Sequence, residues 1–159
     1  MTRTSVLFVC TGNICRSPTA QGVFEKMVHA AGLAERVRVD SAGTHDYHVG
    51  ESPDARAQAH ARRRGYDLST LRARQVLRAD FEAFDPILAM DRGHLKSLRR
   101  LAPPGYGGLQ LFMDYAPRSL GPDVPDPYYG GADGFERVLD MIEHAAAGLL
   151  RSLADASRG

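Results

Sequence analysis

A short apolar run near the start of the chain passes directly into a turn and then into a helix start. Residues 5–9, SVLFV, contain two valines and a phenylalanine, and the run is short enough for a strand buried on both faces. A turn over residues 10–13 follows. Ser17 and Pro18 then suit the N-cap and the first position of a helix. A buried strand that leads through a tight turn into a helix is typical of α/β folds with parallel strands.

The rest of the chain continues this alternation. The expected further strands are residues 37–43, 86–90 and 109–112, and the expected helices are residues 18–31, 54–64, 93–101 and 134–154. Gly32 is placed to end the first of these helices. Because parallel strands need helical crossovers, the pattern predicts a three-layer α/β fold, with helices on both faces of a four-stranded parallel sheet. With 159 residues and no internal repeat or linker, we expect one domain over residues 1–159.

Charge and hydropathy argue against two classes of partner. The chain carries 20 basic and 19 acidic residues, a net charge of +1, so it lacks the positive excess of a dedicated nucleic-acid binder. No apolar run approaches the ~20 residues of a membrane helix. The apolar stretch near the N-terminus is too short for the core of a signal peptide, and we therefore expect a cytoplasmic protein that binds no membrane.

Cys10 lies at the carboxyl end of the first expected strand, where open α/β sheets bind their ligands. Between Cys10 and Arg16, the backbone N–H groups of residues 11–15 can converge on an anion, and the helix that follows adds positive potential. Gly12 and Asn13 both tolerate the left-handed conformations that a tight loop needs. This setting favours the thiolate form of Cys10. The loop predicts a sulfur nucleophile facing a phosphate group whose oxygens are held by amides and by the planar fork of Arg16.

Two further side chains of the loop carry sulfur or oxygen. Ser17, besides capping the helix, can donate its hydroxyl to the Cys10 sulfur and stabilise it as a leaving group. Cys15 is either a structural residue, with only its amide facing the phosphate, or a redox partner, and the sequence leaves both open. Two cysteines are too few for a structural zinc site, and the histidines show no metal-binding spacing, so we expect no metal and no cofactor.

A thiolate cannot supply the proton that the leaving oxygen of a phosphate ester needs, so a carboxylic acid must lie above it. The loop over residues 121–127, GPDVPDP, offers Asp123 and Asp126. Both carboxylates lie among prolines in a polar loop. Local chemistry therefore does not choose between them.

The segment VCTGNICRSP over residues 9–18 resembles the phosphate loop of the low-molecular-weight protein tyrosine phosphatases. Other segments that resemble this family, in the family's order, are DSAGT at 40–44, ARQ at 73–75, MD at 90–91 and DPYYG at 126–130. The resemblance implies metal-free hydrolysis of phosphotyrosine and other aryl phosphates through a cysteinyl-phosphate intermediate. It also implies phosphotyrosine-containing proteins or small aryl phosphates as substrates and inorganic phosphate as product. We expect a monomer or weak dimer, and the sequence does not choose between the two.

The resemblance also assigns roles to individual residues. It selects Asp126, which precedes Pro-Tyr, as the acid and later the base, and leaves Asp123 as a solvated loop residue. It implies that Cys15 can form a reversible disulfide with Cys10, which would protect the nucleophile from irreversible oxidation. The residues it brings to the substrate are Thr11, Gly12, Asn13, Ile14, Cys15 and Ser17 from the loop, and the aromatic residues Tyr47, Tyr128 and Tyr129. Tyr47 stands where many relatives have tryptophan, which makes the slot for an aryl group roomier.

Three positions affect which properties of the family can be expected of this chain. Leu71 stands where relatives commonly have a histidine that helps to hold the loop asparagine, so Asn13 must be held by other partners. His94 replaces a frequent asparagine, and we expect it to affect a helix start rather than catalysis. Ile14 is a branched apolar residue of the kind found in members that accept phosphotyrosine, whereas threonine there marks members that act on phosphoarginine.

Two alternative functions are compatible with the same loop. A thiol-dependent arsenate reductase on this fold relays a disulfide through further cysteines, and none follows Cys15. A catalytically silent phosphate-binding module would recognise phosphorylated partners without hydrolysing them. The presence of Cys10, Arg16 and Asp126 together favours an enzyme over such a module.

Overall fold

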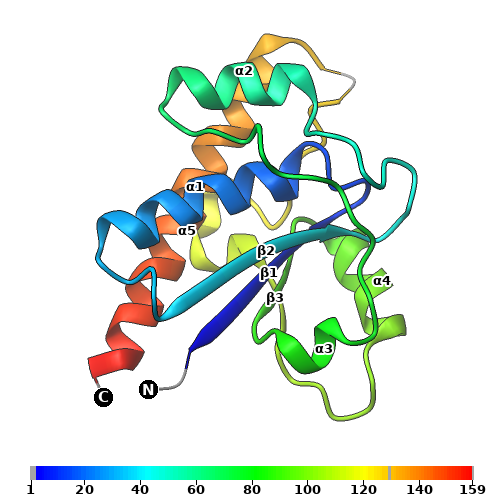
Figure 1. Cartoon of the computed structure of the whole chain (residues 1–159), viewed down its shortest axis with the longest axis vertical. Coiled ribbons are helices and arrows are strands. Elements are labelled where there is room, and N and C mark those ends of the chain that lie inside the picture. The colour runs from blue at the N-terminus through cyan, green and yellow to red at the C-terminus, as the bar shows by residue number, and fades with distance from the viewer. Residues whose placement is uncertain (1–2, 129, 159) are drawn as a thin grey trace.

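The sheet has four strands, all parallel, in the order β2-β1-β3-β4 (Figure 1). The computed structural model describes residues 3–128 and 130–158. The strands are β1 Thr4–Cys10, β2 Val37–Gly43, β3 Ile87–Ala89 and β4 Leu109–Leu111. These strands confirm the four that the sequence predicts, with β3 and β4 one or two residues shorter.

The helices follow the expected alternation. They are α1 Arg16–Ala30, α2 Ala55–Arg63, α3 Asp80–Ala83, α4 Arg92–Leu101 and α5 Ala132–Arg158, with 3₁₀ helices at Phe112–Tyr115 and Arg118–Leu120. The sequence pattern does not predict α3 or the two 3₁₀ helices, because three or four residues are too few to show a helical period. Within the described ranges, no helix is both long and apolar enough to cross a membrane.

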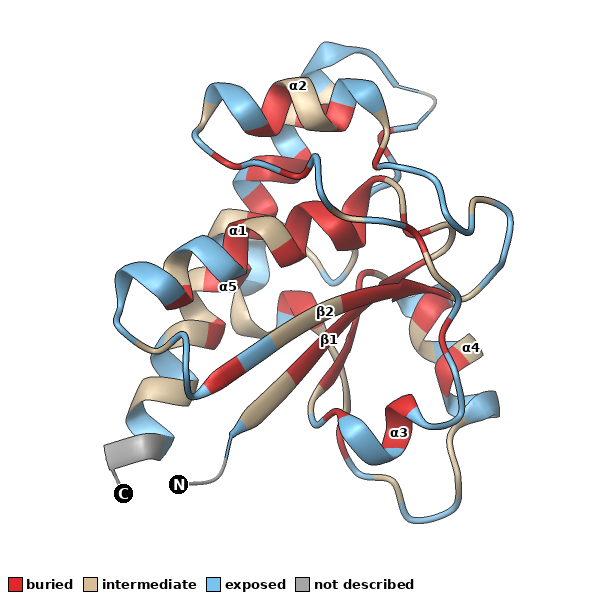
Figure 2. Cartoon of the chain, in the orientation of Figure 1, coloured by how far each residue is buried: buried red, intermediate tan, exposed pale blue. Residues whose placement is uncertain are grey.

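Helices cover both faces of the sheet, as the sequence predicts. On β1, Val6 and Phe8 point to the layer of α1 and α5, and Leu7 and Val9 point to the layer of α3 and α4. All four side chains are fully buried, and Figure 2 shows that most of β1 and the carboxyl end of β2 are buried. A strand with apolar residues on both faces therefore forms the centre of the core.

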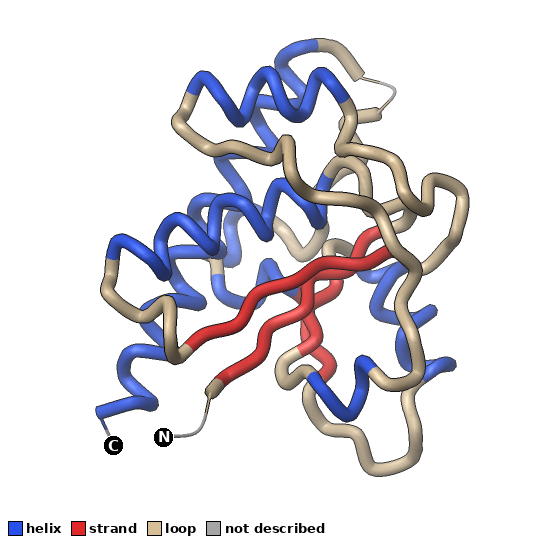
Figure 3. The backbone as a smooth tube through the Cα atoms, in the orientation of Figure 1, coloured by secondary structure: helices blue, strands red, loops and turns tan. Residues whose placement is uncertain are grey.

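The loops that leave the carboxyl ends of the strands gather at one edge of the sheet, away from the two chain termini (Figures 1 and 3). Cys10 pairs in register with Gly43, so the ends of β1 and β2 lie side by side. A Cβ atom on Gly43 would lie 2.6 Å from the carbonyl oxygen of Thr11. Glycine at this position therefore allows the loop after β1 to pack against the end of β2.

The start of α1 differs from the prediction. The N-cap residue is Cys15, whose side chain makes no capping hydrogen bond, and Ser17 lies inside the first turn. The assignment of Ser17 as N-cap was wrong because its hydroxyl contacts the Cys10 sulfur instead of the helix backbone. The other end of the helix agrees with the prediction, since Gly32 follows it with a φ of 74°.

Candidate active site

The loop between β1 and α1 curls around the position of Cys10. Asn13 adopts the left-handed conformation expected for it, with a φ of 57°. The Cys10 Sγ atom lies 3.0 Å from the Ser17 hydroxyl, and both residues are buried. This contact is the one that the sequence analysis expects between Ser17 and the sulfur. A hydroxyl that donates to sulfur stabilises the thiolate.

Asn13 is fixed by three neighbours. Its Nδ2 donates to the hydroxyls of Ser17, at 2.8 Å, and Ser41, at 2.9 Å. Its Oδ1 accepts from the backbone N–H of Arg74, at 3.0 Å. The partners that replace the histidine found in relatives are therefore hydroxyls and a backbone amide, and Leu71 packs against the apolar core instead. A fully hydrogen-bonded asparagine holds the loop in one conformation.

Arg16 is buried and held from several sides. Its Nη1 donates to Asp91 Oδ2 at 2.9 Å and to the carbonyl oxygen of Val124 at 3.0 Å. Its Nη2 lies 3.8 Å from Asp126 Oδ2 and 3.4 Å from His94 Nε2. A buried guanidinium is costly without such partners. Here they also fix the plane of its fork beside the phosphate loop.

The loop after the second 3₁₀ helix brings Asp126 to the same place. The backbone N–H of the fully buried Val124 donates to the Met90 carbonyl oxygen at 2.8 Å, which ties the loop to the end of β3. Asp126 Oδ1 accepts from the backbone N–H of Tyr128 at 3.0 Å. The Asp126 side chain is 46% exposed, so it faces both Arg16 and solvent. A carboxylic acid in this position can reach the leaving group of a bound ester.

Asp123 has a different function from the solvated loop residue that the sequence analysis expects. It accepts hydrogen bonds from the Arg92 guanidinium, at 2.8 Å, and from the Arg92 backbone N–H, also at 2.8 Å. These interactions lower the pKa of the Asp123 carboxyl. An acid held in its ionised form by an arginine is a poor proton donor. Asp123 instead anchors the loop to the start of α4.

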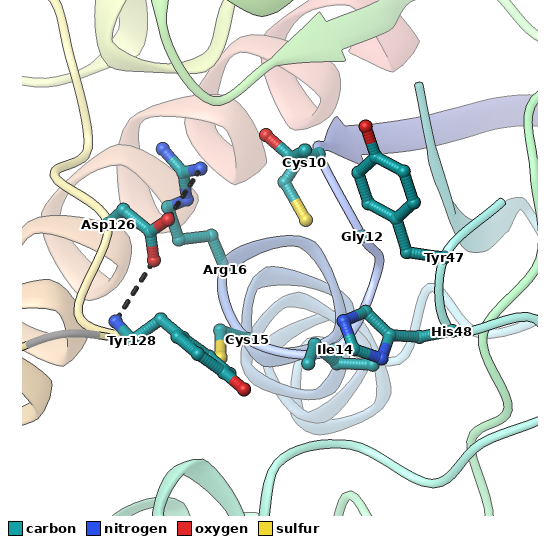
Figure 4. A pocket seen from close by; sticks show the side chains of 10 residues that line it. Cys10, Gly12, Ile14, Cys15, Arg16, Tyr47, His48, Asp126 and Tyr128 are labelled. Atoms are coloured by element: carbon teal, nitrogen blue, oxygen red, sulfur yellow. Dashed lines mark hydrogen bonds and ion pairs between the residues drawn. The ribbon is translucent and has the colours of Figure 1, made fainter. Parts of the chain in front are cut away.

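A pocket of about 220 Å³ opens above the loop (Figure 4). The residues that line it are Cys10, Thr11, Gly12, Ile14, Cys15, Arg16, Tyr47, His48, Asp126 and Tyr128. The Cys10 sulfur points into its centre, with Asp126 and Tyr128 on one side and Tyr47 and His48 on the other (Figure 4). The structure thus brings most of the expected site residues together. Asn13 and Ser17 support the loop from below, and Tyr129 lies outside the described residues.

The two tyrosines that line the pocket, Tyr47 and Tyr128, differ in their exposure and in their neighbours. Tyr47 is 68% exposed and stacks on His45 with ring centres 4.9 Å apart. Tyr128 is 38% exposed, and the Arg56 guanidinium lies 5.3 Å from the centre of its ring. Both rings present flat apolar surface that an aryl group can contact.

Two histidines reach the site without being predicted. The ring of His48 lines the pocket and packs over Gly12. His94 is buried behind the loop, with its Nε2 2.7 Å from the Thr11 hydroxyl. The expectation that His94 affects only a helix start was therefore incomplete. Its side chain joins α4 to the phosphate loop, and residues 83 positions apart share no sequence pattern.

Cys15 is buried against Ile14, Ala57 and Phe135. Burial, reinforced by the neighbouring Asp54 and by Cys10, raises the pKa of the Cys15 thiol to about 12. Cys15 is therefore protonated at neutral pH. Both cysteines are free thiols, which leaves Cys10 as the sulfur suited to nucleophilic attack.

The protein-family comparison matches residues 5–158 to the model of the low molecular weight phosphotyrosine protein phosphatases. A Streptomyces coelicolor protein named low molecular weight protein-tyrosine-phosphatase is 48% identical over 158 residues, covering 97% of this chain and 96% of the relative. The chain belongs to the low-molecular-weight protein tyrosine phosphatase family. The resemblance drawn from the phosphate loop is thereby confirmed.

Solved structures of this phosphatase family also match the fold. A protein tyrosine phosphatase from Entamoeba histolytica superposes with a TM-score of 0.93 at 39% identity, covering 97% of this chain and 99% of the other. YfkJ from Bacillus subtilis superposes with a TM-score of 0.92 at 38% identity, covering 98% of each chain. This low-molecular-weight phosphatase is therefore a hydrolase. Its membership of the family argues against the alternative function of an arsenate reductase. Within residues 3–128 and 130–158, no group of three or more His, Cys, Asp or Glu side chains is arranged to hold a metal ion.

Proposed function

We propose that this phosphatase hydrolyses phosphotyrosine and other aryl phosphates through a cysteinyl-phosphate intermediate on Cys10. In the first step the Cys10 thiolate attacks phosphorus, the ester P–O bond breaks, and Asp126 gives its proton to the leaving oxygen. In the second step ionised Asp126 takes a proton from water as that water attacks phosphorus. The S–P bond breaks, and inorganic phosphate leaves with the thiolate restored.

The observation that carries this proposal is the convergence of Cys10, Arg16 and Asp126 on one pocket. The charge of the transition state spreads over the equatorial oxygens of phosphorus. Arg16 supplies a fixed fork of donors to these oxygens, together with the loop amides. Ser17, 3.0 Å from the sulfur, stabilises Cys10 as it is expelled in the second step.

The pocket walls support an aryl phosphate as substrate. Tyr47 and Tyr128 flank the pocket and offer faces on which a phenyl ring can stack. Ile14 also lines the pocket with a branched apolar side chain, which suits the ring of phosphotyrosine. We therefore infer that the partners are phosphotyrosine-containing proteins or small aryl phosphates.

Three further proposals concern the protein as a whole. Residues 1–159 form one phosphatase domain, in keeping with a family match over residues 5–158. The catalytic groups all come from one chain, so a monomer or a weak dimer suffices for the chemistry. Catalysis needs a reduced Cys10, which fits a cytoplasmic location, where thiols are kept reduced.

Hydrolysis of nitrophenyl phosphate with and without a chelator tests the proposed function. We expect unchanged turnover after treatment with EDTA, because every step uses side chains of this chain. Rapid mixing should also show a burst of nitrophenolate close to one equivalent per enzyme, as the intermediate forms before it is hydrolysed. Strict dependence on a divalent cation would exclude this mechanism. Tight binding of the ester without hydrolysis would indicate a silent phosphate-binding module.

A further inference from the structure

The side chain of His94 connects α4 to the back of the phosphate loop. His94 is 5% exposed and lies in the first turn of α4, next to the carboxyl ends of β1 and β3. Its Nε2 is 2.7 Å from the hydroxyl of Thr11 and 3.4 Å from Nη2 of Arg16. One ring atom therefore contacts both the residue after the nucleophile and the arginine of the loop.

The partners of His94 determine which nitrogen carries the proton. Arg16 can only donate, so Nε2 facing it has a free lone pair. The proton of the neutral ring then lies on Nδ1, which is buried 3.1 Å from the Asp91 carboxylate oxygen Oδ1 but makes no hydrogen bond among the described residues. Burial and the charge of Arg16 lower the pKa of His94 to about 4, against the opposing effect of Asp91 and Asp126. The ring is therefore uncharged at neutral pH.

An unprotonated Nε2 sets the direction of the bond to Thr11. Because Nε2 carries no proton, the Thr11 hydroxyl donates to it, and this fixes the side chain of the residue that follows Cys10. The same nitrogen lies 3.4 Å from Nη2 of Arg16, and Asp126 Oδ2 lies 3.8 Å from that Nη2. His94 Nε2 thus gives Nη2 an uncharged acceptor in addition to the Asp126 carboxylate.

We propose that His94 is a positioning residue for the phosphatase reaction, whose Nε2 holds Thr11 and Arg16 in the arrangement that fits the transition state. The inference rests on the proposed function of the site. Preorganised donors stabilise a transition state more than a ground state, because they need not move when charge develops. Loss of the Nε2 acceptor should therefore weaken binding of a transition-state analogue more than binding of the product.

Two substitutions of His94 test the proposal. His94→Leu removes the acceptor and leaves an apolar side chain of similar size, while His94→Gln keeps an amide oxygen in reach of the Nε2 position. We expect His94→Leu to lower kcat on nitrophenyl phosphate about tenfold. The affinity for vanadate, which mimics the trigonal-bipyramidal transition state, should fall by about the same factor. The affinity for inorganic phosphate should fall by less than about threefold. In His94→Gln, kcat and vanadate affinity should recover most of the loss seen in His94→Leu.

Leu98→Ala is the matched control for a destabilised α4. Leu98 is fully buried one turn further along the helix, in the core cluster on the far side of the sheet from the α1 layer. Calorimetry of vanadate and phosphate binding needs no turnover. It therefore measures the effect of the His94 substitutions on anion affinity even if the wild-type protein proves inactive on esters. Inactivity of the wild type on every aryl phosphate would exclude the proposed function alone. A vanadate-to-phosphate affinity ratio in His94→Leu equal to that in Leu98→Ala would show that His94 is only structural, and would overturn the inference.

Discussion

Replacement of Cys10 by serine should reduce turnover of aryl phosphates by about 10⁴-fold or more, because the nucleophile is lost. A serine hydroxyl is not ionised at neutral pH, and the amides and Arg16 that favour a thiolate do not ionise an alcohol. The substitution changes one buried atom, so the phosphate loop and its anion site should remain. We expect phosphate affinity within a few-fold of the wild type. The measurement is kcat on nitrophenyl phosphate, together with calorimetry of phosphate binding.

Cys15→Ser is the matched control for this experiment. It makes the same change of sulfur to oxygen in the same loop, at a thiol that burial keeps protonated. Turnover in Cys15→Ser should fall by less than about tenfold, since the loss is one of packing against Ile14, Ala57 and Phe135. Full activity in Cys10→Ser, or an equal loss in both variants, would remove Cys10 from the mechanism.

Replacement of Asp126 by alanine should produce a loss that depends on the leaving group. A proton donor contributes about 10²–10⁴-fold where the departing oxygen is basic, and much less where the leaving group is stable as an anion. We therefore expect a loss of about 10²-fold or more on phenyl phosphate and a clearly smaller loss on nitrophenyl phosphate. Rates measured over a series of substituted phenyl phosphates give the comparison.

Asp123→Ala distinguishes the acid from its neighbour. Asp123 lies in the same loop and is bound to Arg92, so its removal loosens the loop without removing a proton donor. This variant should melt at a lower temperature than the wild type and should show no dependence of the loss on the leaving group. The rate of Asp126→Ala could instead fall equally on all esters, while the rate of Asp123→Ala falls more for poorer leaving groups. That result would show that Asp123 is the proton donor and Asp126 is not.

The local parts of the site follow from the sequence, and the long-range parts do not. The phosphate loop lies within the ten consecutive residues 9–18, so the left-handed Asn13 and the contact between Cys10 and Ser17 follow from residue types and spacing. The bond from Asn13 to Ser41 joins residues 28 positions apart, and the bond from Thr11 to His94 joins residues 83 apart. No periodic pattern relates such pairs, because they form only once the strands are aligned side by side.

The choice of acid shows the same limit. Asp123 and Asp126 are chemically equivalent in the sequence, and the resemblance to the family was needed to prefer one of them. Their partners in the structure distinguish them, because Asp123 forms an ion pair with Arg92 and Asp126 lines the pocket. The sequence places the start of the first helix two residues late for a related reason. Ser17 suits an N-cap by residue type, but its hydroxyl contacts a sulfur that lies seven positions earlier.

Protection of Cys10 from iodoacetamide by inorganic phosphate tests most directly whether the loop presents this sulfur to a bound phosphate group. Burial keeps Cys15 protonated, so the label reports Cys10, and the Cys10→Ser variant gives the background. We expect the wild-type protein to be alkylated at neutral pH and inorganic phosphate to suppress the rate, because the anion occupies the loop above the sulfur. A rate that saturating phosphate leaves unchanged would contradict this arrangement.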